Sequence, residues 1–178
     1  MNLLVAAMPH ASVRDAIEDR RRSCLWPEGY WLANPDRLHM TLCQLGDVPG
    51  SRLKELRAVL AEQRMEKSEL LIRMPRPSES TTEFNVQVTP AFSDFRNRMH
   101  RSLALAGFSV KGGRRPHITL SYDFLAVAPP VAMPAIPWVP CEFVLIWSQL
   151  KPQFAKAKHV RLGEFPAQAP RQQALFSD

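Results

Sequence analysis

The sequence contains few cysteines and no long apolar segment. The three cysteines among its 178 residues, Cys24, Cys43 and Cys141, are scattered and odd in number, which is not the pattern of a disulfide framework. We therefore expect a reducing, cytoplasmic compartment. No apolar run approaches the length of about 20 residues that a membrane span requires, so we expect no membrane association. The apolar opening Leu3–Met8 lacks a basic leader and predicts a buried first strand rather than a signal peptide.

The composition suits one globular domain with a basic surface. Apolar residues make up 46% of the chain and the formal net charge is +6. A positive charge favours polyanionic partners such as RNA, although charge alone often serves only solubility. The length fits one domain, or two small lobes that share a core. We expect a single bilobal domain over residues 1–166 and a flexible tail over 167–178, because the final residues are polar and small.

A pattern of His, apolar, Thr, apolar occurs twice, at His39–Leu42 and at His117–Leu120. On a β-strand successive side chains point to opposite faces, so each histidine shares a face with its threonine and the apolar residues point the other way. The two polar side chains are then roughly 6–7 Å apart along the strand. This spacing lets an imidazole and a hydroxyl contact different oxygen atoms of one small anionic group.

The two motifs, in the forms LHMTL and RPHITL, resemble the signature of the two-histidine phosphoesterase superfamily. The similarity is greatest to its bacterial branch of 2′-5′ RNA ligases and RNA 2′,3′-cyclic phosphodiesterases, and it extends from about Asn2 to Phe165. Leu45-Gly46 after the first motif and Arg115-Pro116 before the second also match this branch. The resemblance implies an α+β fold with two similar lobes of antiparallel sheet and flanking helices, related by a pseudo-two-fold axis around a central cleft.

The resemblance also implies a function. His39 and His117 would be the catalytic pair, Thr41 and Thr119 would bind the phosphate, and neither a metal ion nor another cofactor is expected. Near neutral pH one imidazole of a pair can be neutral while the other is protonated, but the sequence does not say which is acid and which is base. The expected substrates are 2′,3′-cyclic phosphates of RNA ends or small nucleotides, opened to 2′-phosphates, with reversible 2′-5′ RNA ligation as a further activity. We expect a monomer.

Four further residues are candidates for substrate binding. Arg114 and Arg115 precede the second motif, where they could neutralise phosphates next to the scissile one, and Tyr122 follows that motif. Trp31 belongs to the aromatic segment Trp26–Trp31, whose rings could stack on a base. The same rings could instead cover the edge of the core, and the sequence leaves both interpretations open.

Periodicity predicts the remaining elements. A helix is expected from Ser12, with Ser12 and Asp15 as a capping box and a solvated basic end at Arg20–Arg22. His100 is expected at the surface, and the proline-rich segment 126–140 is expected to be a connection rather than a strand. Further helices are predicted over residues 50–66 and 90–106, and strands over 37–45, 68–74, 84–89, 141–149 and 158–165.

Three other functions compete with this interpretation. His39 and Cys43 would share a face of one strand, but four strand residues span about 13 Å, too far for two ligands of one zinc ion. No Gly-x-Ser-x-Gly segment supports a serine nucleophile. A non-catalytic module that binds RNA or a nucleotide in the same cleft is the remaining alternative, although such a module has no need of two titratable groups.

Overall fold

The computed structural model describes the chain except residues 30–31, 78–80, 112–114, 122–132, 150–157 and 170–178. The described residues form one eight-stranded antiparallel sheet with the order β6-β3-β4-β5-β2-β1-β7-β8. The strands are β1 (Asn2–Ala7), β2 (Met40–Asp47), β3 (Leu70–Pro77), β4 (Thr82–Gln87), β5 (His117–Ser121), β6 (Ile136–Trp138), β7 (Glu142–Gln149) and β8 (Lys158–Pro166). The helices are α1 (Ala11–Arg22), α2 (Leu53–Ala61) and α3 (Pro90–Leu105), with 3-10 turns η1 (Pro35–Arg37) and η2 (Gly50–Arg52).

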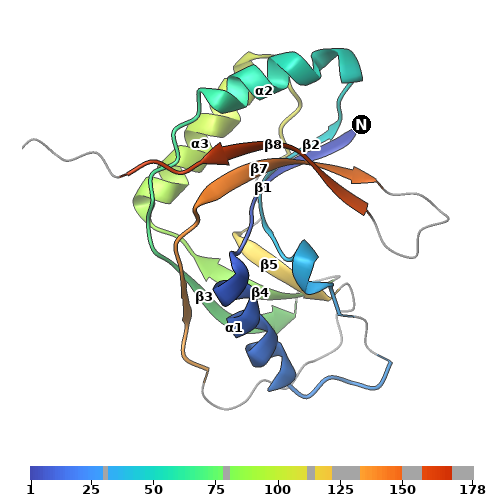
Figure 1. Ribbon diagram of the computed structural model, residues 1–178, viewed down its shortest axis with the longest axis vertical. Coiled ribbons are helices and arrows are strands. Elements are labelled where there is room, and N and C mark those ends of the chain that lie inside the picture. The colour runs from blue at the N-terminus through green and yellow to red at the C-terminus, as the bar shows by residue number, and fades with distance from the viewer. Residues whose placement is uncertain (30–31, 78–80, 112–114, 122–132, 150–157, 170–178) are drawn as a thin grey trace, which may run out of the picture.

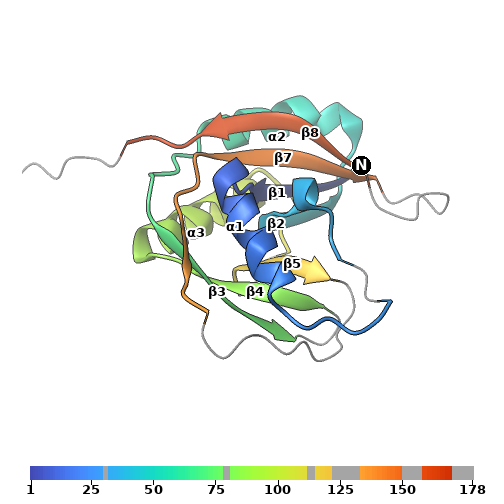
Figure 2. The same ribbon diagram turned by 60° about the horizontal axis from the view of Figure 1, so that its bottom comes forward.

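The sheet has two halves, which are joined where β5 pairs with β2. Figures 1 and 2 show α1 lying against the half built from β3, β4 and β5, whereas α2 and α3 lie beside β7 and β8. The helices are therefore crossed: α1 follows β1 but covers the half that contains β4, and α3 follows β4 but covers the half that contains β1. Phe95 of α3 contacts Phe143 of β7 with ring centroids 5.4 Å apart, and Arg20 of α1 donates a hydrogen bond to the carbonyl of Pro134, just before β6. The crossed helices tie the two halves together.

The helix α1 ends at Arg22, as predicted, but its cap and the burial of Arg21 differ from the prediction. The helix begins at Ala11, and its N-cap is His10, without a side-chain cap. The Ser12 hydroxyl instead bonds to the ring of His10, so the capping-box assignment was wrong. Arg21, predicted to lie in a solvated run, is buried and donates a 2.5 Å hydrogen bond to the carbonyl of Ala33. An unpaired charge could not be buried there, and the carbonyl together with Glu18 satisfies it.

Proline does not stop the strands where the sequence analysis placed breaks. β3 continues through Pro75 to Pro77, with a register shift between Ile72 and Pro75. β6 lies inside the segment predicted to be a connection and pairs only with Leu70–Ile72. Proline lacks an N–H and is therefore tolerated at bulges and at edge positions. Both prolines of β3 lie beyond the residues paired with β6, where β4 is the only paired neighbour among the described strands.

The helix after β4 was predicted correctly. Thr89 caps α3 by accepting a hydrogen bond from the Phe92 amide, and Gly107, with φ of 75°, takes the left-handed conformation that ends a helix. The preceding helix is shorter than predicted, because it ends at Ala61 rather than near residue 66. No helix among the described residues is long and apolar enough to cross a membrane.

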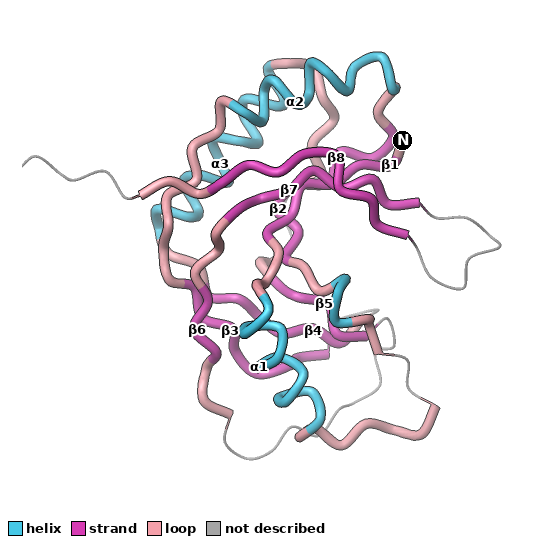
Figure 3. The backbone as a smooth tube through the Cα atoms, viewed as in Figure 1, coloured by secondary structure: helices cyan, strands magenta, loops and turns pink. Residues whose placement is uncertain are grey.

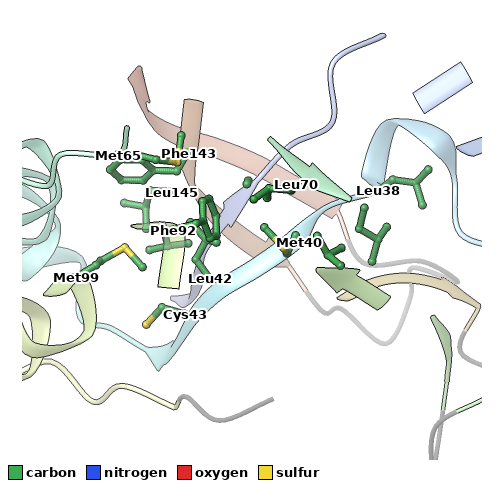
Figure 4. Packing of buried hydrophobic residues seen from close by; sticks show 14 of the residues in the cluster. Leu38, Met40, Leu42, Cys43, Met65, Leu70, Phe92, Met99, Phe143 and Leu145 are labelled. Carbon is green, nitrogen blue, oxygen red and sulfur yellow. The ribbon is translucent and has the colours of Figure 1, made fainter. Parts of the chain in front are cut away.

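The apolar residues of the two motif strands form part of one core. Leu38, Met40, Leu42, Ile118 and Leu120 are each at most 1% exposed. Figure 4 shows Met40 and Leu42 along β2, with Phe92 of α3 and Leu145 of β7 beside them. Figure 3 shows the motif strands β2 and β5 between α1 on one side and α2 and α3 on the other. At the other end of the chain, Gln168, assigned to the tail, donates a hydrogen bond to the carbonyl of Met65.

Candidate active site

The two motif strands are neighbours at the centre of the sheet. Met40 of β2 pairs with Ile118 of β5 in antiparallel register. This register sets His39 beside Thr119 and Thr41 beside His117, on the face opposite the buried Met40–Ile118 pair. All four polar side chains are half-buried. The fold therefore interleaves the two motifs, so that each histidine lies next to the threonine of the other motif.

Both imidazoles are held in the same way. Nδ1 of His39 lies 2.7 Å from the carbonyl oxygen of Arg37, and Nδ1 of His117 lies 2.7 Å from that of Arg115. A carbonyl oxygen only accepts, so each Nδ1 carries the proton and donates. Nε2 is then the second nitrogen of each ring, and that of His117 faces a carboxylate. The two bonds repeat one local geometry, from a histidine to the residue two positions before it.

A β-bulge shapes β2 just after the first motif. The pairing of β1 with β2 shifts between Val5, which faces Cys43, and Ala6, which faces Thr41, so Leu42 is the extra residue. The carbonyl of Leu42 accepts hydrogen bonds from Arg96 Nε at 2.9 Å and from His100 Nε2 at 2.8 Å. Two side chains of α3 thus fix the bulge that ends the motif.

The bulge and its contacts correct two expectations. Cys43 does not share the face of His39, because the extra residue turns its side chain into the core, where burial raises its thiol pKa to about 12. His100 is a half-buried hydrogen-bond donor rather than a surface residue. A strand with strict alternation would have placed Cys43 as predicted, and without the bulge the carbonyl of Leu42 would not be turned toward α3.

A carboxylate faces the second histidine. Nε2 of His117 lies 3.3 Å from Oε2 of Glu83, a residue of β4 that pairs with Thr119. Because Nδ1 already donates to a backbone carbonyl, an ion pair with Glu83 requires a proton on Nε2 as well. The contact therefore suits the imidazolium form of His117.

The first histidine has the opposite surroundings. Burial lowers the pKa of His39, and the charges of His117 and Arg37 lower it further, against the upward effect of the backbone hydrogen bond. The ring of His159 on β8 lies edge-on to His39, with centroids 5.3 Å apart. Burial lowers the pKa of His159 to about 4, and the charges of His39 and Arg37 contribute to this decrease. At neutral pH both rings are neutral.

Similar chains are found among solved structures, whereas no protein-family model and no curated protein sequence matches. A crystal structure of a phosphoesterase superposes with a TM-score of 0.78 at 22% identity, over 93% of this chain and 98% of that one. E. coli LigT complexed with NADP+ gives 0.77 at 21% identity, over 93% and 97%. TT0787 of Thermus thermophilus gives 0.77 at 22% identity, over 96% and 100%. The chain has the LigT fold.

This result confirms the predicted fold class. The LigT fold is two-lobed and pseudo-symmetric, and the two halves of the sheet on either side of the β2–β5 contact are its lobes in this chain. At these identities the likeness concerns the fold alone.

Of the four further candidates for substrate binding, the structure describes only Arg115. Arg114, Tyr122 and Trp31 are outside the described residues. Arg115 is exposed, and its carbonyl binds the ring of His117. Trp26, from the same aromatic segment as Trp31, packs against the core and donates a 2.7 Å hydrogen bond to the carbonyl of Arg21. For Trp26, covering the core is therefore the correct interpretation.

Three side chains of the site were missed by sequence reasoning. Glu83 lies just before the strand predicted over residues 84–89 and belongs to β4, and only the sheet order shows that this strand lies beside the second motif. His159 had no sequence signal, because its strand and β2 are separated by two others. Arg37 did have one: the repeat is longer than His-x-Thr and reads Arg-x-His-x-Thr-Leu in both copies, with Arg37 equivalent to Arg115.

Proposed function

We propose that the protein is a phosphodiesterase that opens 2′,3′-cyclic phosphates of RNA ends or small nucleotides to 2′-phosphates. One observation carries the proposal. Two imidazoles on adjacent strands are held by equivalent Nδ1 bonds, and each lies beside a threonine hydroxyl. Such an arrangement offers two proton-exchanging atoms and two hydroxyl donors to one phosphate.

The surroundings of the two rings assign their roles in this proposal. Neutral His39 is the general base, because burial and the nearby positive charges disfavour its protonated form. His117 is the general acid, because Glu83 pairs with its protonated form. General acids and bases contribute about 10²–10⁴ each to a rate.

Each proton in the reaction has a donor and an acceptor. The oxygen of a water molecule attacks phosphorus and gives a proton to Nε2 of His39, while the bond from phosphorus to the ribose 3′ oxygen breaks. Nε2 of His117 gives its proton to that departing oxygen, and a 2′-phosphate results. Exchange of one proton with solvent restores both rings. The steps can also run in reverse on a 2′-5′ linkage. The ribose 3′ oxygen then attacks phosphorus, a ribose 5′-hydroxyl departs in place of water, and a cyclic phosphate forms; the forward direction, with the 5′-hydroxyl as the attacking group, makes the 2′-5′ linkage.

The threonines take the charge on the phosphate. Thr41 and Thr119 are half-buried on the same face as the rings, and their hydroxyls can donate to the non-bridging oxygens as negative charge accumulates there. Solved complexes of E. coli LigT with phosphate, 3′-AMP and ATP support a nucleotide ligand for a cleft of this fold.

Turnover of a 2′,3′-cyclic mononucleotide tests the proposal. Phosphorus NMR should show a single 2′-phosphate product, and His39→Ala and His117→Ala should each remove most turnover while the circular dichroism spectrum is kept. A mixture of 2′- and 3′-phosphates would refute the proposed mechanism, in which only the bond from phosphorus to the 3′ oxygen breaks. The alternative, a binding module that uses the same cleft, predicts nucleotide binding without turnover in the unmodified protein.

A further inference from the structure

We propose that Arg37 and His159 form an anion subsite beside His39, which binds a second phosphate group of the substrate, carried on the 5′ oxygen of the terminal nucleoside. The proposal rests on the proposed function, because it extends the same cleft. It identifies the preferred substrate class as nucleotides with a phosphate on both sides of the ribose, such as an RNA end, rather than an unphosphorylated nucleoside cyclic phosphate.

Arg37 lies in the half-buried wall of the site and has no counter-ion among the described residues. Neither an ion pair nor a hydrogen bond to its guanidinium occurs among the described residues, although its neighbour Asp36 pairs with Arg14 at 3.9 Å. Its Nε is buried and unpaired. The two terminal nitrogen atoms also lack a partner among the described residues and are not fully buried. A planar guanidinium with free donors is the side chain that best matches a phosphate.

His159 completes the subsite from a different strand. Its ring contacts His39 edge-on, and its Nδ1 is buried without a hydrogen-bond partner in the part of the chain that is described. β8 and β2 are separated by β1 and β7 in the sheet order, yet the ring centroids of His159 and His39 lie only 5.3 Å apart. An unpaired imidazole nitrogen and an unpaired guanidinium thus flank the same catalytic histidine.

The charge distribution across the site agrees with this role. Glu83 lies on the His117 side. The His39 side carries Arg37 and the exposed Lys158 next to His159, and its carboxylate, Asp36, is paired with Arg14. The charge of Arg37 acts on both His39 and His159. A dianionic phosphate is attracted to the His39 side and repelled from the Glu83 side.

A positioning role is the competing explanation. Arg37 and His159 could simply orient the ring of His39, with no contact to substrate. The two explanations differ in what they predict for ligands. A subsite favours ligands with the 5′-phosphate selectively, while a positioning role affects turnover of all substrates equally.

Binding of stable product analogues distinguishes them without requiring turnover. We expect adenosine 2′,5′-bisphosphate to bind about 10-fold to 100-fold more tightly than adenosine 2′-phosphate in calorimetry. Arg37→Gln and, to a lesser extent, His159→Phe should reduce that ratio toward one. Arg101→Gln removes the same charge from an exposed position on α3 and should leave the ratio unchanged. Melting temperatures and circular dichroism check that each variant is folded.

The possible failures are separable. A ratio near one in the unmodified protein, or an equal ratio in Arg37→Gln, overturns the subsite even if cyclic phosphates are hydrolysed. A ratio that depends on Arg37 in a protein that hydrolyses no cyclic phosphate supports the subsite and overturns the proposed function. Equal loss of kcat for substrates with and without the 5′-phosphate, with the binding ratio intact, assigns Arg37 and His159 to positioning alone.

Discussion

Nε2 of His117 lies 3.3 Å from a carboxylate oxygen of Glu83 on the neighbouring strand. His39, whose Nδ1 bond is the same, has no such partner among the described residues and instead lies beside His159 and Arg37. Two copies of one motif have therefore acquired opposite electrostatic surroundings. This asymmetry is the physical basis for the roles of acid and base that we propose.

The role of His117 can be tested with the leaving group. A thiolate leaves without a proton, so a cyclic substrate with sulfur in place of the ribose 3′ oxygen does not need a general acid. We expect His117→Ala to lose about 10²–10⁴ in kcat on the oxygen substrate and to recover most of it on the sulfur substrate. His39→Ala should be impaired on both.

Glu83→Gln is the companion variant in the same assay. It keeps the size of the side chain but removes the charge that pairs with the imidazolium, so turnover of the oxygen substrate should fall by about 10-fold with a smaller effect on the sulfur substrate. Recovery of His39→Ala rather than His117→Ala would reverse the assignment.

The pH dependence should report the base. His39 must be neutral to accept a proton, and its pKa lies below the usual 6.5 because of burial and nearby positive charges. The acidic limb of kcat/KM should therefore lie below pH 6.5. Arg37→Gln removes one of these charges, raises the pKa of His39 and should move the limb to higher pH. Arg101→Gln is the control. An acidic limb above 6.5 in the unmodified protein would contradict the role of His39.

The threonine hydroxyls should matter for the transition state. Thr41→Val and Thr119→Val keep the shape of the side chain and lose the donor, which typically costs about 10²–10³ in kcat for a donor to developing negative charge. Steady-state kinetics on a cyclic mononucleotide measure the loss. An effect confined to KM would instead mean that the hydroxyls only bind the ground state.

Activity should survive exhaustive treatment with EDTA. The proposed steps use only imidazole and hydroxyl groups, and among the described residues no three His, Cys, Asp or Glu side chains are grouped as metal ligands. Rates before and after chelation, with Mg²⁺ and Zn²⁺ added back separately, are the measurement. Loss of turnover that a divalent ion restores would require a different mechanism.

Binding of RNA oligonucleotides should depend on salt through Arg115. This side chain is exposed two residues before His117. Each single-strand phosphate that is neutralised contributes about −0.7 to the slope of log affinity against log salt. Arg115→Gln should therefore make the slope shallower by about that amount. An unchanged slope would place Arg115 outside the RNA-binding surface.

Local regularities made much of the fold predictable. The apolar alternation around His39 and His117 correctly predicted which side of each motif strand is buried, because side-chain direction on a strand follows from backbone geometry alone. The helix predicted over residues 90–106 agrees with α3, because the residues that end a helix, such as Gly107, act within one turn. The rule that proline ends a strand failed at Pro75 and Pro137, because whether a strand tolerates a proline depends on the strand that pairs with it.

The sequence by itself determined the doubled motif and the buried side of each motif strand, because both follow from residue order and strand geometry alone. Tertiary structure alone decided what surrounds each ring. Glu83 reaches His117 through the pairing of β4 with β5, and the ring of His159, from β8, lies against the ring of His39. These contacts join residues far apart in the chain, so their free energies depend on how the whole sheet packs, which no local pattern encodes.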